Sequence, residues 1–148
     1  MPSACYYVAM LIVANWKAYV EELAKAKKLF ALAKRLRQAT GVSIVLAPSA
    51  PLLGALAVRN KSAVAFAAQD VSLTTGGAHT GEVTAQAYQA TGTTYAIVGH
   101  SERREAGDTD AIVAEKLAHA LAHGLTPILC IGERERDGEG RYLSVVRE

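Results

Sequence analysis

The sequence predicts an α/β protein built on a parallel sheet, and three observations support this class. Short apolar runs alternate with amphipathic helical segments along the chain. The hydrophobic fraction of 51% is high, as expected for parallel strands that are covered on both faces. No low-complexity tract or linker interrupts the 148 residues, so we expect one domain spanning residues 1–148.

Strands and helices are predicted to alternate from residue 11 onward. The strands are expected at residues 11–14, 42–47, 64–68, 95–98 and 127–131. The helices are expected at residues 20–38, 52–59, 84–90 and 110–123, with one more opening within 141–148. Residues 1–9 are expected to be an extension in front of the first strand.

Apolar spacing and end signals define the two long helices. Thr40-Gly41 and Gly124 are expected to end them, and Asp108-Thr109 to cap the second. Apolar residues recur at steps of three and four, which predicts one buried face on each helix. These residues are Leu23, Ala26, Phe30, Ala33 and Leu36 in the first helix, and Val113, Leu117, Ala120 and Leu121 in the second.

The architecture of the sheet is less determined than its class. Repeated right-handed βαβ units imply parallel strands, but the periodicity is compatible with both an open doubly wound sheet and a closed barrel. Polar residues at the strand ends favour the barrel, because they would converge on one rim. No GxGxxG motif or P-loop supports a dinucleotide- or nucleotide-binding sheet. The converging residues are Asn15, Lys17, Gln69, Asp70, His100, Glu102 and Glu133.

The segment Tyr95–Glu105 carries the main candidate for chemistry. An apolar run ends at Gly99, and His100 follows, then Ser101, which could cap a helix, and a block of charge. Ligands of parallel α/β proteins bind at the carboxyl ends of the strands. His100 is therefore the candidate chemical centre. Most of the charge block is expected to form salt bridges.

Charge and cysteine usage argue against several classes of partner. The net charge is +2, with 16 Lys+Arg spread beside 14 Asp+Glu, so no nucleic-acid surface is expected. Cys5 and Cys130 form no metal-ligand cluster, which fits reduced thiols in a cytoplasmic protein. The apolar run 4–14 is too short to span a bilayer. We expect no metal site and no membrane partner.

Four segments occur in order and at suitable distances: Ala14-Asn15-Trp16-Lys17, Thr80-Gly81-Glu82, residues 98–104 (VGHSERR) and residues 127–133 (PILCIGE). Together they resemble the triosephosphate isomerase family, over residues 10–148. The resemblance implies a (β/α)8 TIM barrel, here a partial barrel of about five parallel strands with covering helices. It implies an isomerase of glycolysis and gluconeogenesis. This enzyme interconverts dihydroxyacetone phosphate and D-glyceraldehyde 3-phosphate through an enediol(ate), without a metal or organic cofactor.

The resemblance also implies roles for single residues. Lys17 would meet the negative charge of the substrate and of the enediolate, and Asn15 would bind a substrate oxygen. His100 would be a neutral electrophile, and this family is itself a standard example of that use of histidine. Glu102 would be the carboxylate beside Lys17 and His100. Ser101 and Cys130 match positions close to the family's site, although packing is the expected role of Cys130.

The loop 74–82 resembles the family's dimer loop, with Thr80 and Glu82 at its matching positions. A homo-oligomer is therefore expected. His79 departs from the aromatic or apolar residue of the family, and Ala18-Tyr19 departs from Met-Asn. Both departures fall at the expected dimer contact, so they concern the dimer geometry more than the chemistry.

The family's catalytic glutamate, lid loop and phosphate-binding loops have no counterpart in these 148 residues. Losing a general base costs roughly 10²–10⁴-fold in rate, and Glu133 is a weak substitute because the family uses it structurally. The alternative is a catalytically impaired, self-associating barrel fragment. Three arrangements of the partial barrel are compatible with the sequence: association with a complementing C-terminal half, a rearranged homodimer, and an open half-barrel. A phosphate-sugar binding module using Lys17 and His100 is a weaker third hypothesis.

Overall fold

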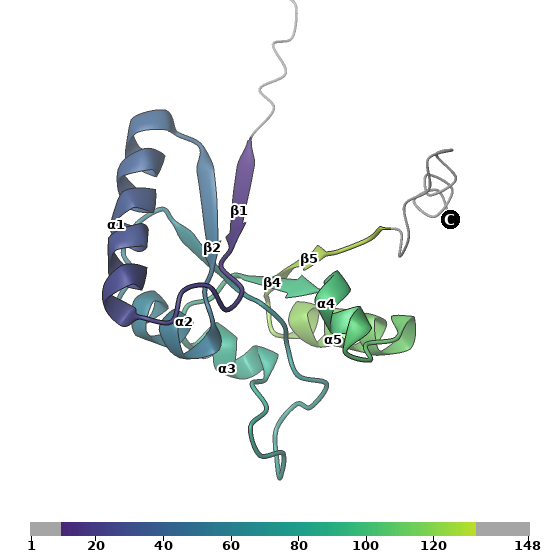
Figure 1. Cartoon of the computed structure of the whole chain (residues 1–148). Coiled ribbons are helices and arrows are strands. Elements are labelled where there is room, and N and C mark those ends of the chain that lie inside the picture. The colour runs from purple at the N-terminus through teal and green to yellow at the C-terminus, as the bar shows by residue number, and fades with distance from the viewer. Residues whose placement is uncertain (1–9, 133–148) are drawn as a thin grey trace, which may run out of the picture.

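A computed structural model describes residues 10–132 and contains one five-stranded sheet (Figure 1). All neighbouring strands are parallel, in the order β1-β2-β3-β4-β5. Each strand therefore lies beside the next strand in sequence, as in a barrel. In a doubly wound sheet, by contrast, the spatial order of the strands reverses at one point in the sheet. The strands are β1 (Leu11–Asn15), β2 (Ser43–Ala47), β3 (Ala65–Ala68), β4 (Tyr95–Val98) and β5 (Thr126–Leu129).

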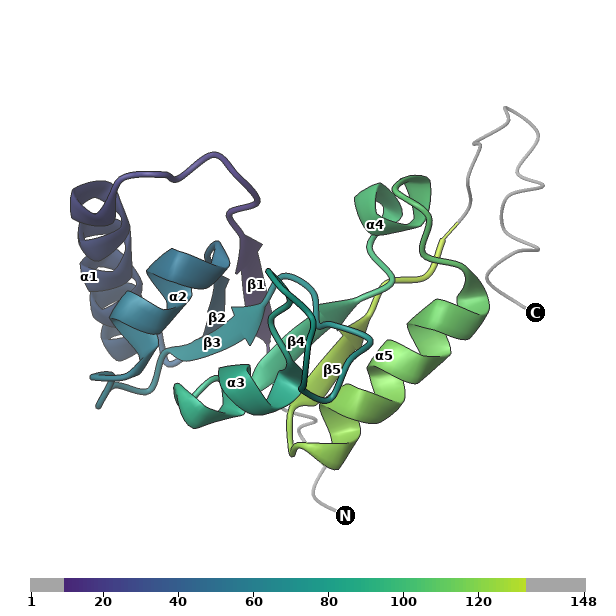
Figure 2. The same cartoon turned by 90° about the horizontal axis from the view of Figure 1, so that it is seen from below.

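The sheet curls instead of lying flat, and its helices cover one side (Figures 1 and 2). This is the partial barrel that the sequence and the family resemblance predicted, and the fold class is confirmed. The helices are α1 (Leu23–Thr40), α2 (Ala50–Ala57), α3 (Ala85–Ala90), α4 (Ser101–Glu105) and α5 (Asp110–Ala122).

Local signals set the helix ends much as the sequence predicted. Thr84 and Thr109 are N-caps whose side chains accept hydrogen bonds from Ala87 N and Ile112 N. Gly41 ends α1 in the left-handed region at φ 73°, which costs glycine little because it lacks a Cβ. The second helix was expected at residues 52–59, but α2 begins at Ala50 and ends at Ala57, with Val58 at its C-cap.

The two faces of the sheet are buried unequally, as the period-two alternation along each strand allows. Ile44 and Leu46 of β2 face the helices and join the large apolar cluster that includes Phe66 and Leu53. Val45 and its neighbours face the other way and form a much smaller cluster, made of Val45, Ala47, Ala67 and Ile97. The helix-covered face is therefore the main core.

Three residues predicted to be buried on the long helices are instead exposed. Leu23, Leu36 and Leu121 are 41%, 47% and 58% exposed. The reason is position in the sheet. Within residues 10–132, the main contacts of α1 are with α2 and β2, and those of α5 are with β4 and β5. A spacing pattern finds the apolar stripe of a helix but does not show whether a neighbour covers all of it.

Other expectations concern residues near the chain ends. The last strand ends at Leu129, two residues earlier than predicted, and Ile131 lies outside it. The extension 1–9, Glu133 and the helix expected within 141–148 all lie outside the described residues. Within residues 10–132, no helix is long and apolar enough to cross a membrane.

Candidate active site at the carboxyl ends of the strands

His100 is presented at the carboxyl end of β4, as expected, and it begins α4. Gly99 makes the turn at φ 73°, where an added Cβ would lie 3.0 Å from Val113 Cγ1 and 3.1 Å from Arg104 Nη2. The His100 Nδ1 accepts a hydrogen bond from Glu102 N at 3.2 Å. His100, not Ser101, is therefore the N-cap, because its ring nitrogen supplies the acceptor. A neutral ring that accepts at Nδ1 carries its proton on Nε2, where it can donate to a ligand.

Lys17 is held in an unusual backbone conformation after β1. Its φ is 48°, in the left-handed region that residues with a Cβ rarely occupy. Asn15 Oδ1 accepts from Lys17 N at 2.9 Å, and Gln69 Nε2 donates to Lys17 O at 2.9 Å and to Ala47 O at 2.8 Å. Side chains from the ends of two strands thus fix the lysine backbone, and such over-determined strain is typical of functional sites.

Lys17 and Glu102 link the ends of β1 and β4. Lys17 Nζ lies 2.8 Å from Glu102 Oε1, and Glu102 Oε2 lies 3.7 Å from His100 Nδ1. This hydrogen bond raises the pKa of Lys17 and lowers the pKa of Glu102 from their ordinary values, while partial burial opposes both shifts. The three side chains expected at the centre of the site therefore lie together: Lys17 and Glu102 form an ion pair, and His100 lies beside Glu102.

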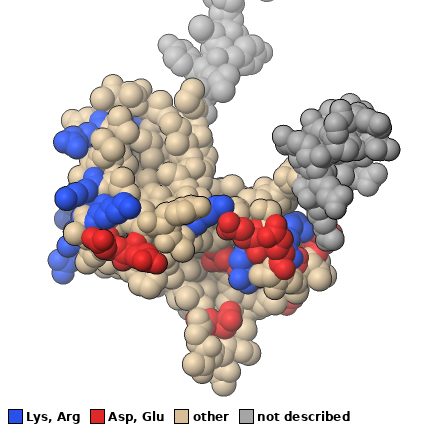
Figure 3. All heavy atoms as spheres, in the orientation of Figure 1, with Lys and Arg blue, Asp and Glu red and all other residues tan. Residues whose placement is uncertain are grey.

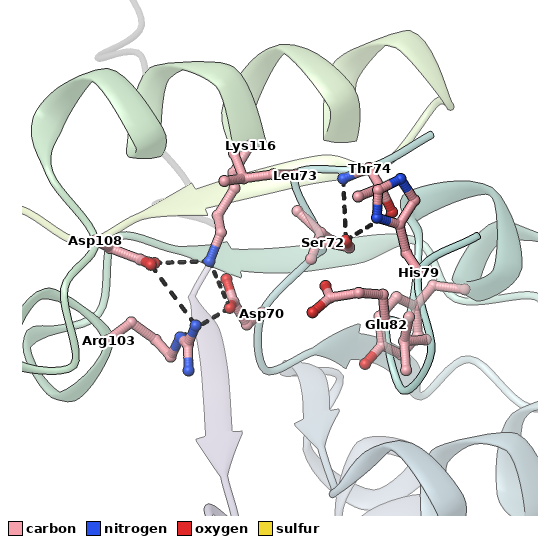
Figure 4. Close-up of a pocket in the computed structure, with 12 residues that line it drawn as sticks. Asp70, Ser72, Leu73, Thr74, His79, Glu82, Arg103, Asp108 and Lys116 are labelled. Atoms are coloured by element: carbon pink, nitrogen blue, oxygen red, sulfur yellow. Dashed lines mark hydrogen bonds and ion pairs between the residues drawn. The ribbon is translucent and has the colours of Figure 1, made fainter. Parts of the chain in front are cut away.

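A second ionic cluster joins Asp70, Arg103, Asp108 and Lys116 (Figure 4). Lys116 Nζ is 2.7 Å from both Asp70 Oδ2 and Asp108 Oδ2, and Arg103 Nε is 2.9 Å from Asp70 Oδ2. Lys116 is only 3% exposed. The sequence interpretation missed it, although a lysine three residues after Val113 and four before Ala120 falls on the predicted buried face of the helix. A charged residue at a position predicted to be buried was the sequence signal that could have identified Lys116.

The charge block of α4 is used mainly in ion pairs, as predicted. Arg104 pairs with Asp110 and donates from Nε to Gly99 O at 2.8 Å, and Arg103 pairs with Asp70. Glu105 has no ion-pair partner within the described part of the chain. Figure 3 shows acidic and basic side chains side by side over α4, whereas basic side chains dominate over α1.

Thr80 and Glu82 lie in the long segment between β3 and α3, which extends away from the sheet (Figure 1). Both are exposed. Glu82 lines a cavity of about 450 Å³ with Asp70, Arg103 and Lys116 among its walls (Figure 4). Among residues 10–132, neither residue forms a hydrogen bond or ion pair with Lys17, His100 or Glu102.

Cys130 lies beside the trio but serves packing in this structure. It packs against the smaller apolar cluster, and burial raises the pKa of its thiol. It also lines, with His100, a cavity of about 580 Å³ at the end of β5. No three His, Cys, Asp or Glu side chains within residues 10–132 could hold a metal ion together.

Consecutive parallel strands, helices on the outer face and charged side chains at the carboxyl ends define the class of (β/α)-barrel proteins with a rim site. A sequence model of the family described as triosephosphate isomerase matches residues 10–148. The chain belongs to the triosephosphate isomerase family.

Curated relatives support this assignment. The chain is 44% identical over 126 residues to the triosephosphate isomerase of Thermus thermophilus, covering 84% of this chain and 50% of that protein. It is 46% identical over 140 residues to that of Delftia acidovorans, and 44% over 141 residues to that of Ralstonia nicotianae, each covering 93% of this chain and 56% of the relative. The chain thus spans about half the length of the curated relatives it matches.

Proposed function

We propose that this chain supplies the electrophilic part of a triosephosphate isomerase active site. The reaction is the interconversion of dihydroxyacetone phosphate and D-glyceraldehyde 3-phosphate through an enediol(ate), in glycolysis and gluconeogenesis in the cytoplasm. The observation that carries the proposal is the trio of Lys17, His100 and Glu102 at the ends of β1 and β4. Lys17 Nζ pairs with Glu102 Oε1 at 2.8 Å, and the His100 ring lies 3.7 Å from Glu102 Oε2.

His100 and Lys17 are the catalytic residues in this proposal. A proton on His100 Nε2 would be donated to the carbonyl oxygen of the substrate, which develops negative charge as a proton leaves the adjacent carbon. Lys17 would supply a fixed positive charge for the enediolate and the phosphate. Its ordering by Asn15 and Gln69 supports this role, because a preorganised charge needs no rearrangement during the reaction.

Asn15 and Glu102 assist these two residues. Asn15 holds the Lys17 backbone through its Oδ1, and its Nδ2 has no hydrogen-bond partner within the described residues, so it is free to bind a substrate oxygen. Glu102 orients the Lys17 ammonium in the absence of substrate. We assign Thr80 and Glu82 to a dimer loop, because they are exposed on a segment that extends from the sheet.

The partner of the chain is proposed to be another barrel segment, either a complementing C-terminal half or a second copy. Supporting this, large apolar side chains are exposed along both edge strands. Residues 1–148 then form one incomplete barrel domain that association completes. The exposed residues are Met10, Leu11 and Ile12 at β1, and Leu129 and Ile131 at β5.

The test is isomerisation by this chain alone and mixed with the remaining C-terminal segment of the Thermus thermophilus relative. Because the family's general base is not among these residues, we expect the chain alone to be slower by at least about 10²–10⁴-fold. The mixture should recover activity, and His100→Ala in this chain should remove it. Equal rates for the mixture with His100 and with His100→Ala would overturn the proposal. The solution mass of each sample identifies self-association.

A further inference from the structure

Helix α4 carries Glu102 and begins at His100, yet it has no apolar anchor. None of its five residues, Ser101–Glu105, is buried. Short helices in proteins are normally held by packing an apolar face against a core. Something else must therefore fix the direction in which α4 presents Glu102 to Lys17.

Ion pairs replace packing at α4. Arg104 reaches back to the Gly99 carbonyl at 2.8 Å and outward to Asp110, whose side chain is 92% exposed. Arg103 reaches in the other direction, to Asp70 at 2.9 Å and Asp108 at 3.6 Å, whose side chains are 23% and 8% exposed. Removing one partner of an exposed ion pair costs little, whereas removing one partner of a shielded pair leaves a charge without compensation. Loss of Arg103 should therefore disturb α4 more than loss of Arg104.

The two acids that hold Arg103 are themselves placed by Lys116. Its Nζ lies 2.7 Å from one oxygen of each, and its side chain is 4% exposed (Figure 4). Asp70 follows β3, Asp108 precedes α5 and Lys116 belongs to α5, so the lysine joins segments far apart in sequence. Two cations and two carboxylates leave the cluster electrically neutral, and each charge has an opposite partner.

We propose that Lys116 is a positioning residue for the candidate site. It holds Asp70 and Asp108 where both can bind Arg103, and Arg103 orients α4 so that the adjacent Glu102 meets Lys17. This inference rests on the proposed function for its catalytic meaning, whereas the chain of contacts is independent of turnover. Lys116 does not touch the trio, and acts only through Arg103.

The test is an NMR titration of the Glu102 carboxyl in the 148-residue chain, with thermal melting recorded beside it. We compare Lys116→Met and Arg103→Met with Lys28→Met, a matched control that removes one exposed positive charge from α1. Both test variants should raise the pKa of Glu102 toward that of an unpaired glutamate, because the carboxylate loses its close contact with Lys17. Lys28→Met should leave this pKa unchanged.

A purely structural Lys116 would lower the melting temperature and leave the Glu102 pKa at its original value in the folded variant, and that result overturns the inference. If Lys116→Met does not fold, Arg103→Met decides. Arg103→Met keeps Lys116 paired with both acids. An unchanged Glu102 pKa in this variant would also overturn the inference. Because the titration needs no catalysis, absence of isomerase activity in the chain defeats the proposed function without affecting this result.

Discussion

Helices α2 and α4 are both short, and they are held in place by opposite means. Leu52, Leu53, Leu56 and Ala57 of α2 are buried against the sheet, whereas α4 buries none of its residues and is held by ion pairs of Arg103 and Arg104. Apolar burial is strong but non-directional, whereas hydrogen-bonded ion pairs fix orientation. Apolar packing of helices such as α2 therefore holds the fold together, whereas ion pairs set the orientation of α4 and of the site residues near it.

The largest effect is expected on the apolar side of this comparison. Leu53 is 1% exposed, and Leu53→Ala should lower the free energy of unfolding by about 3–5 kcal/mol through lost burial and a cavity. Urea unfolding followed by circular dichroism measures it. Leu121→Ala, at a 58% exposed position, is the control and should stay within about 0.5 kcal/mol of the original. Equal losses would mean that the large cluster is not the core.

On the ionic side, Lys116→Met should cost about 3 kcal/mol of unfolding free energy, because Asp70 and Asp108 keep their charges without the buried cation between them. The same unfolding experiment measures it. The added substitution Asp108→Asn should recover part of the loss, because Arg103 then faces one carboxylate instead of two. No recovery in the double variant would contradict the ion-pair explanation.

The junction between the two regions is Gly99, and a side chain there should be costly. Gly99→Ala places a Cβ against Val113 and Arg104 in a left-handed conformation, at a cost of about 2 kcal/mol. Gly124→Ala is a matched control, since Gly124 has nearly the same φ, at 71°, but its Cβ would meet nothing within 4 Å. The difference between the two melting temperatures isolates the crowding at Gly99.

The smallest effect concerns the exposed pair of Lys17 and Glu102. Glu102→Gln should lower the pKa of Lys17 toward its ordinary value, because the Glu102 hydrogen bond is the main cause raising it. The pair stabilises the fold only between the lowered pKa of Glu102 and the raised pKa of Lys17. The difference in melting temperature between the original chain and Glu102→Gln should therefore vanish as pH falls through the Glu102 pKa. A difference that persists in acid would contradict this.

The sequence predicted the apolar side of the molecule better than the ionic side. Short apolar runs located the five strands, and three-to-four-residue spacings located the long helices, because both patterns depend on local burial. The same spacing could not show that Leu36 and Leu121 lie on uncovered flanks. Coverage depends on which elements become neighbours.

The candidate site was predicted in part for a similar reason. Lys17, His100 and Glu102 were expected together because the ends of parallel strands meet, and they do meet. The hydrogen bond from Gln69 that fixes the Lys17 backbone across 52 positions, and the pairing of Lys116 with Asp70 across 46 positions, depend on three-dimensional contacts. No local pattern encodes such long-range pairs.

Amide hydrogen exchange of α2 and α4, in Leu53→Ala and in Lys116→Met, tests the central claim most directly. If charge fixes α4 and burial fixes α2, Lys116→Met should accelerate exchange in α4 more than in α2. Leu53→Ala should accelerate α2 more than α4. Acceleration of both helices by the same factor in both variants would contradict the account, because the two regions would then open as one unit.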